Sequence, residues 1–277
     1  MDKDVLQLMK NKFFKLSKSQ KRISKYILDN YSKVAFMTAK ELAEATNVSE
    51  STVVRFAHAL DYNGYPEFIE DLQEDIKSKL TTVERLELYK NNNNEIMNLD
   101  IENIKKAIKH NSDQNVENVV NQLSNSKTIY ILGLRSSEIL ADYLTYYLDL
   151  ITNDTVIKKI NNQRIFDTLV KTNPKDSLVA IGFPRYSKMT LKALEYAESN
   201  DSTIIAITDS EVSPLTKFAN FSLYADITMS SFIDSFVAPM SLINLLITKI
   251  SMKNKDYVEE KFQKLEDVWN TFEIYNQ

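Results

Sequence analysis

Hydroxyl and basic side chains near position 50 have the types and spacing needed to contact DNA. Ser51, Thr52 and Arg55 would lie together on the first turns of one helix. Hydroxyls bind bases or phosphates, the threonine methyl group can meet a thymine methyl, and arginine can hold a guanine edge through two hydrogen bonds. Arg55 is the preferred base-reading residue. The residues expected to contact phosphate, which position a protein without giving sequence preference, are Lys40, Ser49 and Tyr65.

Two short helices joined by a tight turn are predicted to position these side chains. Thr38 and Glu41 form a capping-box pattern, which predicts a helix starting at Ala39. That helix would turn Leu42 and the small Ala43 inward. A small residue at this place lets a second helix cross closely, so the pattern favours a compact helical pair.

The turn and the second helix complete a helix-turn-helix pattern. Asn47 stands where the turn needs a positive φ, Val48 is expected to plug the turn, and Ser49 is expected to cap the next helix. The second helix would bury one stripe of side chains: Val53, Phe56, Ala57 and Leu60. The first turns of this helix enter the major groove in such motifs, which favours DNA binding over a plain helical hairpin.

A second group of polar residues follows the predicted strand 128–132. Gly133 ends this strand, and Arg135, Ser136 and Ser137 open the next helix. Free backbone N–H groups at a helix start, with hydroxyls beside them, can bind an anion, although such serines also serve as simple caps. The loop lacks the full glycine pattern of dinucleotide-binding proteins, so NAD is not expected.

A matching group follows the predicted strand 177–181. Gly182 and Pro184 shape the turn, and the polar residues at the next helix entry are Arg185, Ser187, Lys188 and Thr190. Ligands of open parallel sheets bind beyond the carboxyl ends of the strands. Arginine suits two-point capture of phosphate or carboxylate, so the two loops together predict an anionic ligand site.

The chain as a whole reads as two domains of different class. Residues 1–80 show helical patterns only and predict an all-α domain, and residues 81–115 predict a linker and connecting helices. From 116 to 277 short apolar strands alternate with helices, which predicts an α/β domain whose parallel sheet is sandwiched by helices.

Composition narrows the class of protein further. The chain has 277 residues, a net charge of −4 and no cysteine, so disulfides and thiolate metal sites are excluded. Its modest charge argues against non-specific coating of nucleic acid, although the residues up to Lys40 are rich in lysine. No run of apolar residues predicts a signal peptide or membrane span, so we expect a cytoplasmic protein without membrane contact.

The N-terminal half resembles the RpiR family of bacterial regulators. The resemblance rests on LSKSQKRISKYILDN at 16–30, on MTAKELAEATNVSESTVVRF at 37–56, and on Gly64, Tyr65 and Phe68. Asn47 replaces the glycine common at the turn. The family pairs a helix-turn-helix with a sugar isomerase (SIS) domain, so the resemblance implies operator DNA and a phosphorylated sugar as partners.

The C-terminal half resembles the SIS domain over roughly 116–253, with two altered loops. The first loop is usually Gly-x-Gly-x-Ser; Ser137 matches its serine and Arg135 stands at its second glycine. The second is usually Ser-x-Ser-Gly-x-Thr; Ser187 stands at its threonine, and Gly182 and Pro184 replace both serines. The altered loops imply a variant pocket whose two arginines would favour a more anionic metabolite than an ordinary sugar phosphate.

The later segment 230–246 resembles the element by which the family approaches the sugar. Asp234 and Ser235 are candidate pocket residues, and the apolar run after them is expected to form core and dimer interface. The resemblance therefore implies a ligand-responsive regulator, by default a repressor, that works as a homodimer or tetramer.

An isomerase is the competing function because SIS domains also occur in enzymes. The only histidines are His58, in the helix-turn-helix segment, and His110, which precedes the predicted sheet. Glu138 could act as a base, but a lone glutamate in a first helical turn usually serves the helix dipole. Without an acid–base pair we expect no catalysis, cofactor or metal. A DNA-binding protein without a ligand is a third possibility.

Overall fold

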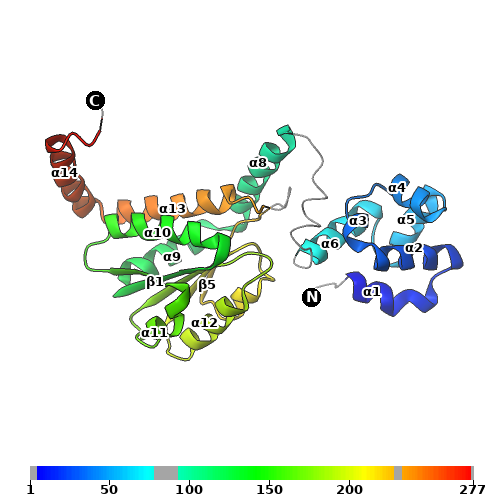
Figure 1. Cartoon of the computed structure of the whole chain (residues 1–277), viewed down its shortest axis with the longest axis horizontal. Coiled ribbons are helices and arrows are strands. Elements are labelled where there is room, and N and C mark those ends of the chain that lie inside the picture. The colour runs from blue at the N-terminus through cyan, green and yellow to red at the C-terminus, as the bar shows by residue number, and fades with distance from the viewer. Residues whose placement is uncertain (1–4, 78–92, 228–232, 276–277) are drawn as a thin grey trace. The chain divides into compact units, whose positions relative to one another are not determined.

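The structure is a computed structural model that describes residues 5–77, 93–227 and 233–275. The described residues divide into two compact units, one formed by 5–77 with 233–234 and the other by 93–227 and 235–275 (Figure 1). The predicted fold classes are confirmed, since the described part of the first unit is helical and the second contains a parallel sheet. The predicted domain boundary at position 80 lies outside the described residues.

Short helices around one apolar core make up the first unit. Its helices are α1 (Val5–Lys12), α2 (Lys18–Asp29), α3 (Tyr31–Val34), α4 (Ala39–Thr46), α5 (Glu50–Ala59) and α6 (Tyr65–Lys77), with a 3-10 turn at Phe13–Lys15. Ile23, Leu42 and Phe56 are completely buried in this core. Phe56 and Phe68 join α5 to α6 by an edge-to-face contact with ring centroids 5.7 Å apart.

The second unit alternates strands with helices. Its strands are β1 (Thr128–Gly133), β2 (Val156–Lys159), β3 (Ser177–Ile181), β4 (Thr203–Thr208) and β5 (Phe221–Tyr224). Its helices are α8 (Asn93–His110), α9 (Asp113–Asn125), α10 (Glu138–Ile151), α11 (Ile165–Leu169), α12 (Lys188–Glu198), α13 (Val237–Lys253) and α14 (Lys255–Thr271). Short 3-10 turns lie at Arg135–Ser137, Asn162–Arg164 and Pro214–Lys217. Ser112 lies at the junction between α8 and α9, and its hydroxyl caps α9.

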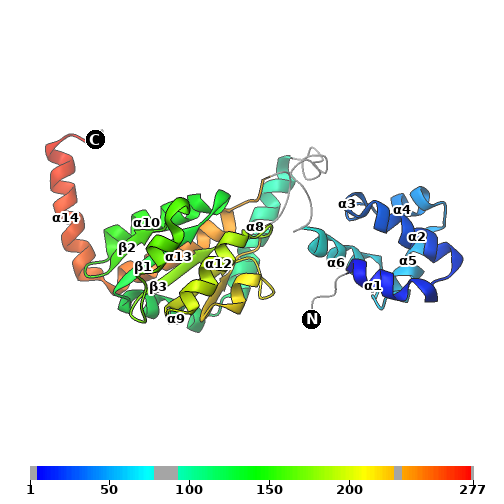
Figure 2. The same ribbon diagram turned by 60° about the horizontal axis from the view of Figure 1, so that its bottom comes forward.

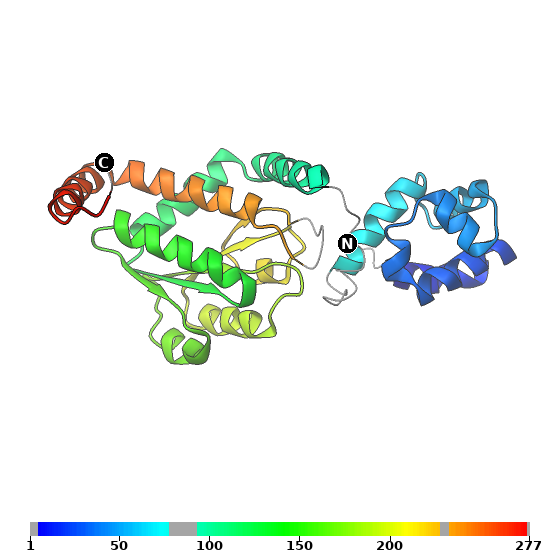
Figure 3. The ribbon, with the colours of Figure 1, turned by 45° about the horizontal axis from the view of Figure 1, so that its top comes forward.

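The five strands form one parallel sheet in the order β2-β1-β3-β4-β5. Alternate side chains of the central strands β1, β3 and β4 enter two separate cores. Ile129, Ile131 and Val179 pack with α9, α10 and α13, whereas Tyr130 and Leu178 pack with α11 and α12. Figure 1 and Figure 3 show α10 and α13 side by side over one face of the sheet. Figure 1 shows α11 and α12 over the other face.

The sheet reverses its winding direction between β1 and β3, which are hydrogen-bonded neighbours. In their register Gly133 lies beside Ile181, so the loops that follow these two residues leave the same edge of the sheet. A reversal of this kind opens a crevice beyond the carboxyl ends of the strands. The fold therefore brings together the two loops that the sequence singled out.

No helix among the residues described is long and apolar enough to cross a membrane. Helix α14 follows α13 directly and has no buried residue (Figure 2).

Candidate DNA-reading helix and ligand loops

The turn between α4 and α5 has the predicted geometry. Thr38 and Glu41 form a reciprocal capping box, in which the Thr38 N–H donates to Glu41 Oε2 at 2.7 Å and the Glu41 N–H donates to Thr38 Oγ1 at 3.2 Å. Asn47 ends α4 with φ 50° and ψ 55°, in the left-handed region. The Val48 N–H then donates to the Ala43 carbonyl at 3.0 Å, which closes the turn over the small residue.

Helix α5 separates a buried stripe from an exposed polar start. The predicted stripe of Val53, Phe56, Ala57 and Leu60 is confirmed, since each is fully buried. Ser51 and Arg55 are exposed, and Thr52 is half-buried. The burial of one face therefore leaves the hydroxyl and guanidinium groups at the start of the helix facing solvent.

Ser49 occupies the N-cap position of α5, but its side chain does not cap the helix. Its hydroxyl lies 2.9 Å from Ser51 Oγ and 2.8 Å from Thr52 Oγ1 and accepts no backbone hydrogen bond. The predicted capping bond is therefore wrong, because three neighbouring hydroxyls bind one another instead. This arrangement leaves the first-turn N–H groups of α5 without a side-chain cap.

Arg55 is connected to the same hydroxyl cluster. Its Nε donates to the Ser51 carbonyl at 3.2 Å, and its Nη2 donates to Thr52 Oγ1 at 3.3 Å. The guanidinium group is thus held along the exposed side of α5, beside Ser51 and Thr52, as the sequence predicted.

Two residues of α2 brace this region and were not identified from the sequence. Gln20 Nε2 donates to the Arg55 carbonyl at 3.2 Å, and Arg22 Nη2 donates to the Asn47 carbonyl at 2.9 Å. The contacts hold both the turn and α5 against α2. These contacts could not be predicted from local sequence, because neither residue is near α5 in the sequence.

Lys40 and Tyr65, both predicted to contact phosphate, have different surroundings. Lys40 is exposed in the first turn of α4. Tyr65 is 6% exposed and donates its hydroxyl hydrogen to the Met37 carbonyl at 2.8 Å. Burial, and to a lesser extent the Glu41 carboxylate, raises the pKa of Tyr65 above its usual range. The one side-chain donor of Tyr65 is therefore used inside the domain, and its predicted phosphate contact stays a prediction.

The loop after β1 makes a very tight turn. A Cβ at Gly133 would lie 2.4 Å from the Ser137 carbonyl oxygen, so only glycine fits. Residues Arg135–Ser137 form a 3-10 turn, and α10 begins at Glu138, directly after the two serines predicted to open it. Arg135 and Ser136 are exposed, whereas Ser137 is 6% exposed.

The loop after β3 is fixed at both ends by β4. The Gly182 N–H donates to the Ile207 carbonyl at 3.1 Å, and the Tyr186 hydroxyl donates to Asp209 Oδ1 at 2.6 Å. Asp209 is 6% exposed and also accepts a hydrogen bond from the Ser210 hydroxyl. Tyr186 and Asp209 were missed in the sequence; the only local signal is an aspartate directly after a buried strand.

The helix that follows this loop places its polar residues unequally. Ser187 caps α12 by accepting from the Met189 N–H at 3.2 Å, and Lys188 is exposed. Thr190 is 2% exposed and belongs to the inward side of α12, so the expectation that it binds ligand is not supported. Ser235 is half-buried and accepts from the Val237 N–H at 3.4 Å at the start of α13.

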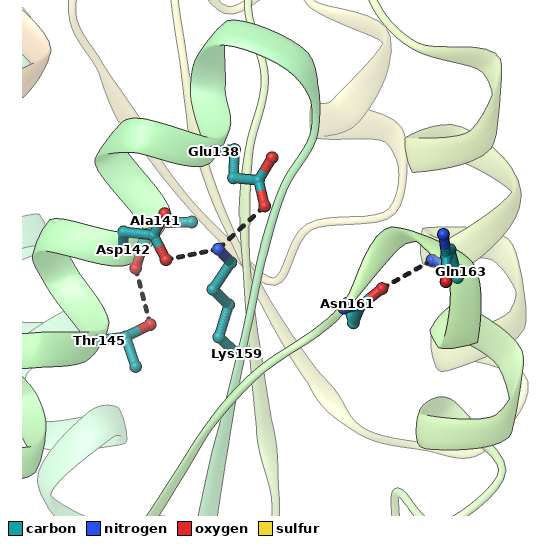
Figure 4. Close-up of polar contacts among 7 residues, drawn as sticks. All are labelled: Glu138, Ala141, Asp142, Thr145, Lys159, Asn161 and Gln163. Atoms are coloured by element: carbon teal, nitrogen blue, oxygen red, sulfur yellow. Dashed lines mark hydrogen bonds and ion pairs between the residues drawn. The ribbon is translucent and has the colours of Figure 1, made fainter.

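Lys159 forms an ion-pair cluster at the carboxyl end of β2. Figure 4 shows its ammonium group between Asp142 and Glu138 of α10, and its distance to Glu138 Oε1 is 2.9 Å. Partial burial alone would lower the pKa of Lys159, but the hydrogen bonds that it donates to Asp142 and Glu138 outweigh this effect and raise it. Glu138 therefore has an ion-pair partner in the fold, as does Lys159.

Comparison with known proteins agrees with both domains. Residues 3–79 match the model of the helix-turn-helix domain of the rpiR family, and residues 122–249 match the SIS domain. Fold and motif thus define a helix-turn-helix transcription regulator with a SIS domain. Within that class, the chain belongs to the RpiR family.

Two similar proteins cover nearly the whole chain, and a third covers 62% of it. An uncharacterized HTH-type transcriptional regulator of Clostridium perfringens is 24% identical over 96% of this chain and 99% of its own length. The structure of Vibrio vulnificus NanR complexed with ManNAc-6P is 19% identical, covers 97% of this chain and 98% of its own, and has a TM-score of 0.56. The sugar isomerase domain of an RpiR transcription factor from Sphaerobacter thermophilus is 22% identical, covers 62% of this chain and 97% of its own, and has a TM-score of 0.59.

Proposed function

We propose that the protein binds operator DNA through α5 and that a phosphorylated sugar, bound beside the loops after β1 and β3, changes its affinity for that DNA. The observation that carries this proposal is the start of α5, where exposed Ser51 and Arg55 and half-buried Thr52 form one hydrogen-bonded group in a domain of the rpiR family.

Base recognition is assigned to Arg55, with Ser51 and Thr52 beside it. Lys40 and Ser49 are assigned to phosphate, which positions the helix. The first-turn N–H groups of α5 lack a side-chain cap, and that of Thr52 donates to the Ser49 carbonyl at 2.8 Å. A DNA phosphate could accept hydrogen bonds from the N–H groups of Glu50 and Ser51. The Ser49 arrangement, unexpected from the sequence, thus suits a DNA-bound helix.

The test of this assignment begins with a duplex selected from a random pool by the intact protein. Arg55→Ala is expected to weaken binding to that duplex by about 10- to 100-fold, as expected for one lost two-point contact to a base. Lys40→Ala is the matched control, because it should weaken selected and random duplexes alike. Equal affinity of Arg55→Ala and wild type for the selected duplex would overturn the assignment.

The ligand site is assigned to the two loops and the start of α13. The proposed contact residues are Arg135, Ser136, Ser137, Arg185, Ser187, Lys188 and Ser235. Support comes from the position of both loops at the switch point between β1 and β3, where open parallel sheets bind ligands. NanR, which has the same fold, is complexed with ManNAc-6P.

We assign no catalytic activity to this site. Glu138, the one candidate base from the sequence, is engaged by Lys159. Incubation with aldose and ketose phosphates should leave them unchanged, and turnover would favour an isomerase instead.

The working form is proposed to be a homodimer, with a tetramer as the larger alternative. Helix-turn-helix proteins read paired half-sites as two-fold dimers. Phe262, Leu265 and Trp269 recur three or four residues apart along α14, of which no residue is buried. Paired parallel helices pack apolar residues of this spacing against each other. Glu266 is exposed beside this apolar seam, and Lys261, on the other flank, donates to the Asp149 carbonyl at 2.8 Å.

The apolar run after Ser235 forms α13, whose Leu242, Ile243 and Leu246 are buried in the core. We therefore assign the dimer contact to a second copy of α14, packed on this seam, rather than to that run. Leu265→Asp should convert the dimer to a monomer in light scattering, whereas Gln263→Asp, outside the seam, should not. A dimer that survives Leu265→Asp would exclude this interface. We propose that the protein represses transcription. Promoter assays with and without the effector distinguish repression from activation.

A further inference from the structure

Two arginines of the sheet domain adopt backbone conformations that their residue type disfavours. Among the residues described, the non-glycine residues with positive φ are Asn47, Asp61, Arg135, Arg185, Asp201 and Glu273. Asparagine and aspartate tolerate this region, and Glu273 follows the end of α14. Arg135, with φ 59°, and Arg185, with φ 64°, have neither explanation.

Both arginines occupy the same functional place in the fold. Arg135 follows β1 and Arg185 follows β3, and these strands are neighbours across the switch point. Glycine would adopt either conformation without strain. The property that arginine adds at each position is therefore its exposed, charged side chain.

The surrounding structure fixes each strained residue between anchored neighbours. Arg135 lies between Leu134, which is 8% exposed in the core, and the turn that closes on Ser137. Arg185 lies between buried Phe183 and Tyr186, whose hydroxyl is held by Asp209. Strained backbone persists where its surroundings determine it, and such positions cluster at ligand sites.

Other charged groups lie at this edge of the sheet besides the two arginines, which are both exposed. Lys159, the nearby cation at the end of β2, is already paired with Glu138 and Asp142. The Asp209 carboxylate accepts hydrogen bonds from Tyr186 and Ser210. Lys188 adds a further exposed cation at the start of α12.

We propose that the effector is a phosphosugar with a second anionic group, either a carboxylate or another phosphate, and that Arg135 and Arg185 select it over singly phosphorylated sugars. This inference rests on the proposed ligand site. Two guanidinium groups on neighbouring loops can bind two separate anionic groups, each through paired hydrogen bonds.

The experiment compares three probes by calorimetry on the full chain: glucose 6-phosphate, 6-phosphogluconate and fructose 1,6-bisphosphate. The wild type should bind one of the doubly anionic probes at least about 10-fold more tightly than glucose 6-phosphate, the size expected for one charge-assisted contact. The better of the two doubly anionic probes identifies the second group as carboxylate or phosphate.

Glycine substitutions separate the side chain from the backbone. Arg135→Gly and Arg185→Gly should each remove about 10-fold or more of this preference while leaving the melting temperature unchanged or higher. Asp201→Gly is the matched control, since it relieves another positive φ, at 54°, in the turn before β4 at the opposite edge of the sheet. Its binding should equal that of the wild type.

The outcomes distinguish this inference from the proposed function. Equal affinity for all three probes, or full preference retained in both glycine variants, would overturn the role of the arginines while leaving a phosphosugar sensor in place. Binding of none of the probes would overturn the proposed effector class and this inference with it.

Discussion

The turn of the helix-turn-helix and the two loops of the sheet domain each contain a residue with positive φ, but the residue types differ. Asn47 takes a left-handed conformation that asparagine tolerates, and the turn needs nothing more from its side chain. Arg135 and Arg185 take similar conformations at greater steric cost. In the DNA-binding domain, the residue type at the turn thus suits its backbone conformation. In the sheet domain, the two arginines adopt a conformation that their residue type disfavours, at the place where a ligand is expected.

The largest difference between the two domains should follow from a substitution in the core of the DNA-binding domain alone. Phe56→Ala should destabilise the first unit by about 3–5 kcal/mol, because the side chain is fully buried and contacts Phe68. Thermal unfolding should show the loss, and DNA binding should fall with it. Sugar phosphate binding serves as the internal control. DNA affinity equal to wild type would contradict the importance of this core.

Substitutions at the positions with positive φ should change the free energy of unfolding by a smaller amount. Asn47→Ala should cost about 1–2 kcal/mol, since alanine is strained at that φ, whereas Asn47→Gly should cost much less. Arg135→Gly should be neutral or stabilising by up to about 1 kcal/mol. Chemical denaturation measures all three. Destabilisation by Arg135→Gly comparable to that of Asn47→Ala would mean that its side chain supports the fold.

The smallest effect concerns the ion-pair cluster at β2. The pKa of Lys159 is raised in the folded protein, so its stabilising contribution is complete below the ordinary lysine pKa and disappears as pH rises through the folded value. Lys159→Met should therefore reduce the loss of stability between neutral and strongly alkaline pH, by no more than about 1 kcal/mol. Parallel pH profiles of wild type and variant would contradict this assignment.

Local patterns explain what could be predicted from the sequence. The capping box at Thr38, the left-handed turn at Asn47 and the buried stripe of α5 each depend on residues within one or two helical turns. The parallel sheet followed from continuous apolar strands that alternate with helices, and the two candidate loops followed from the same alternation.

The features that the sequence did not predict depend mainly on contacts between segments distant in the sequence. Tyr65 is buried because α6 packs back on the segment before α4 and offers it the Met37 carbonyl. Tyr186 is held by Asp209 from the end of another strand. Thr190 faces inward because of how α12 lies on the sheet. None of these contacts leaves a periodic or local signal.

The central claim is that a phosphosugar at the sheet edge controls DNA binding by α5. The most direct measurement is the affinity of the full chain for its selected duplex, by fluorescence anisotropy, without and with a saturating sugar phosphate found by calorimetry. The account predicts a change of about 5- to 150-fold, the range typical of coupled sites. Unchanged affinity in the presence of a bound sugar phosphate would contradict it.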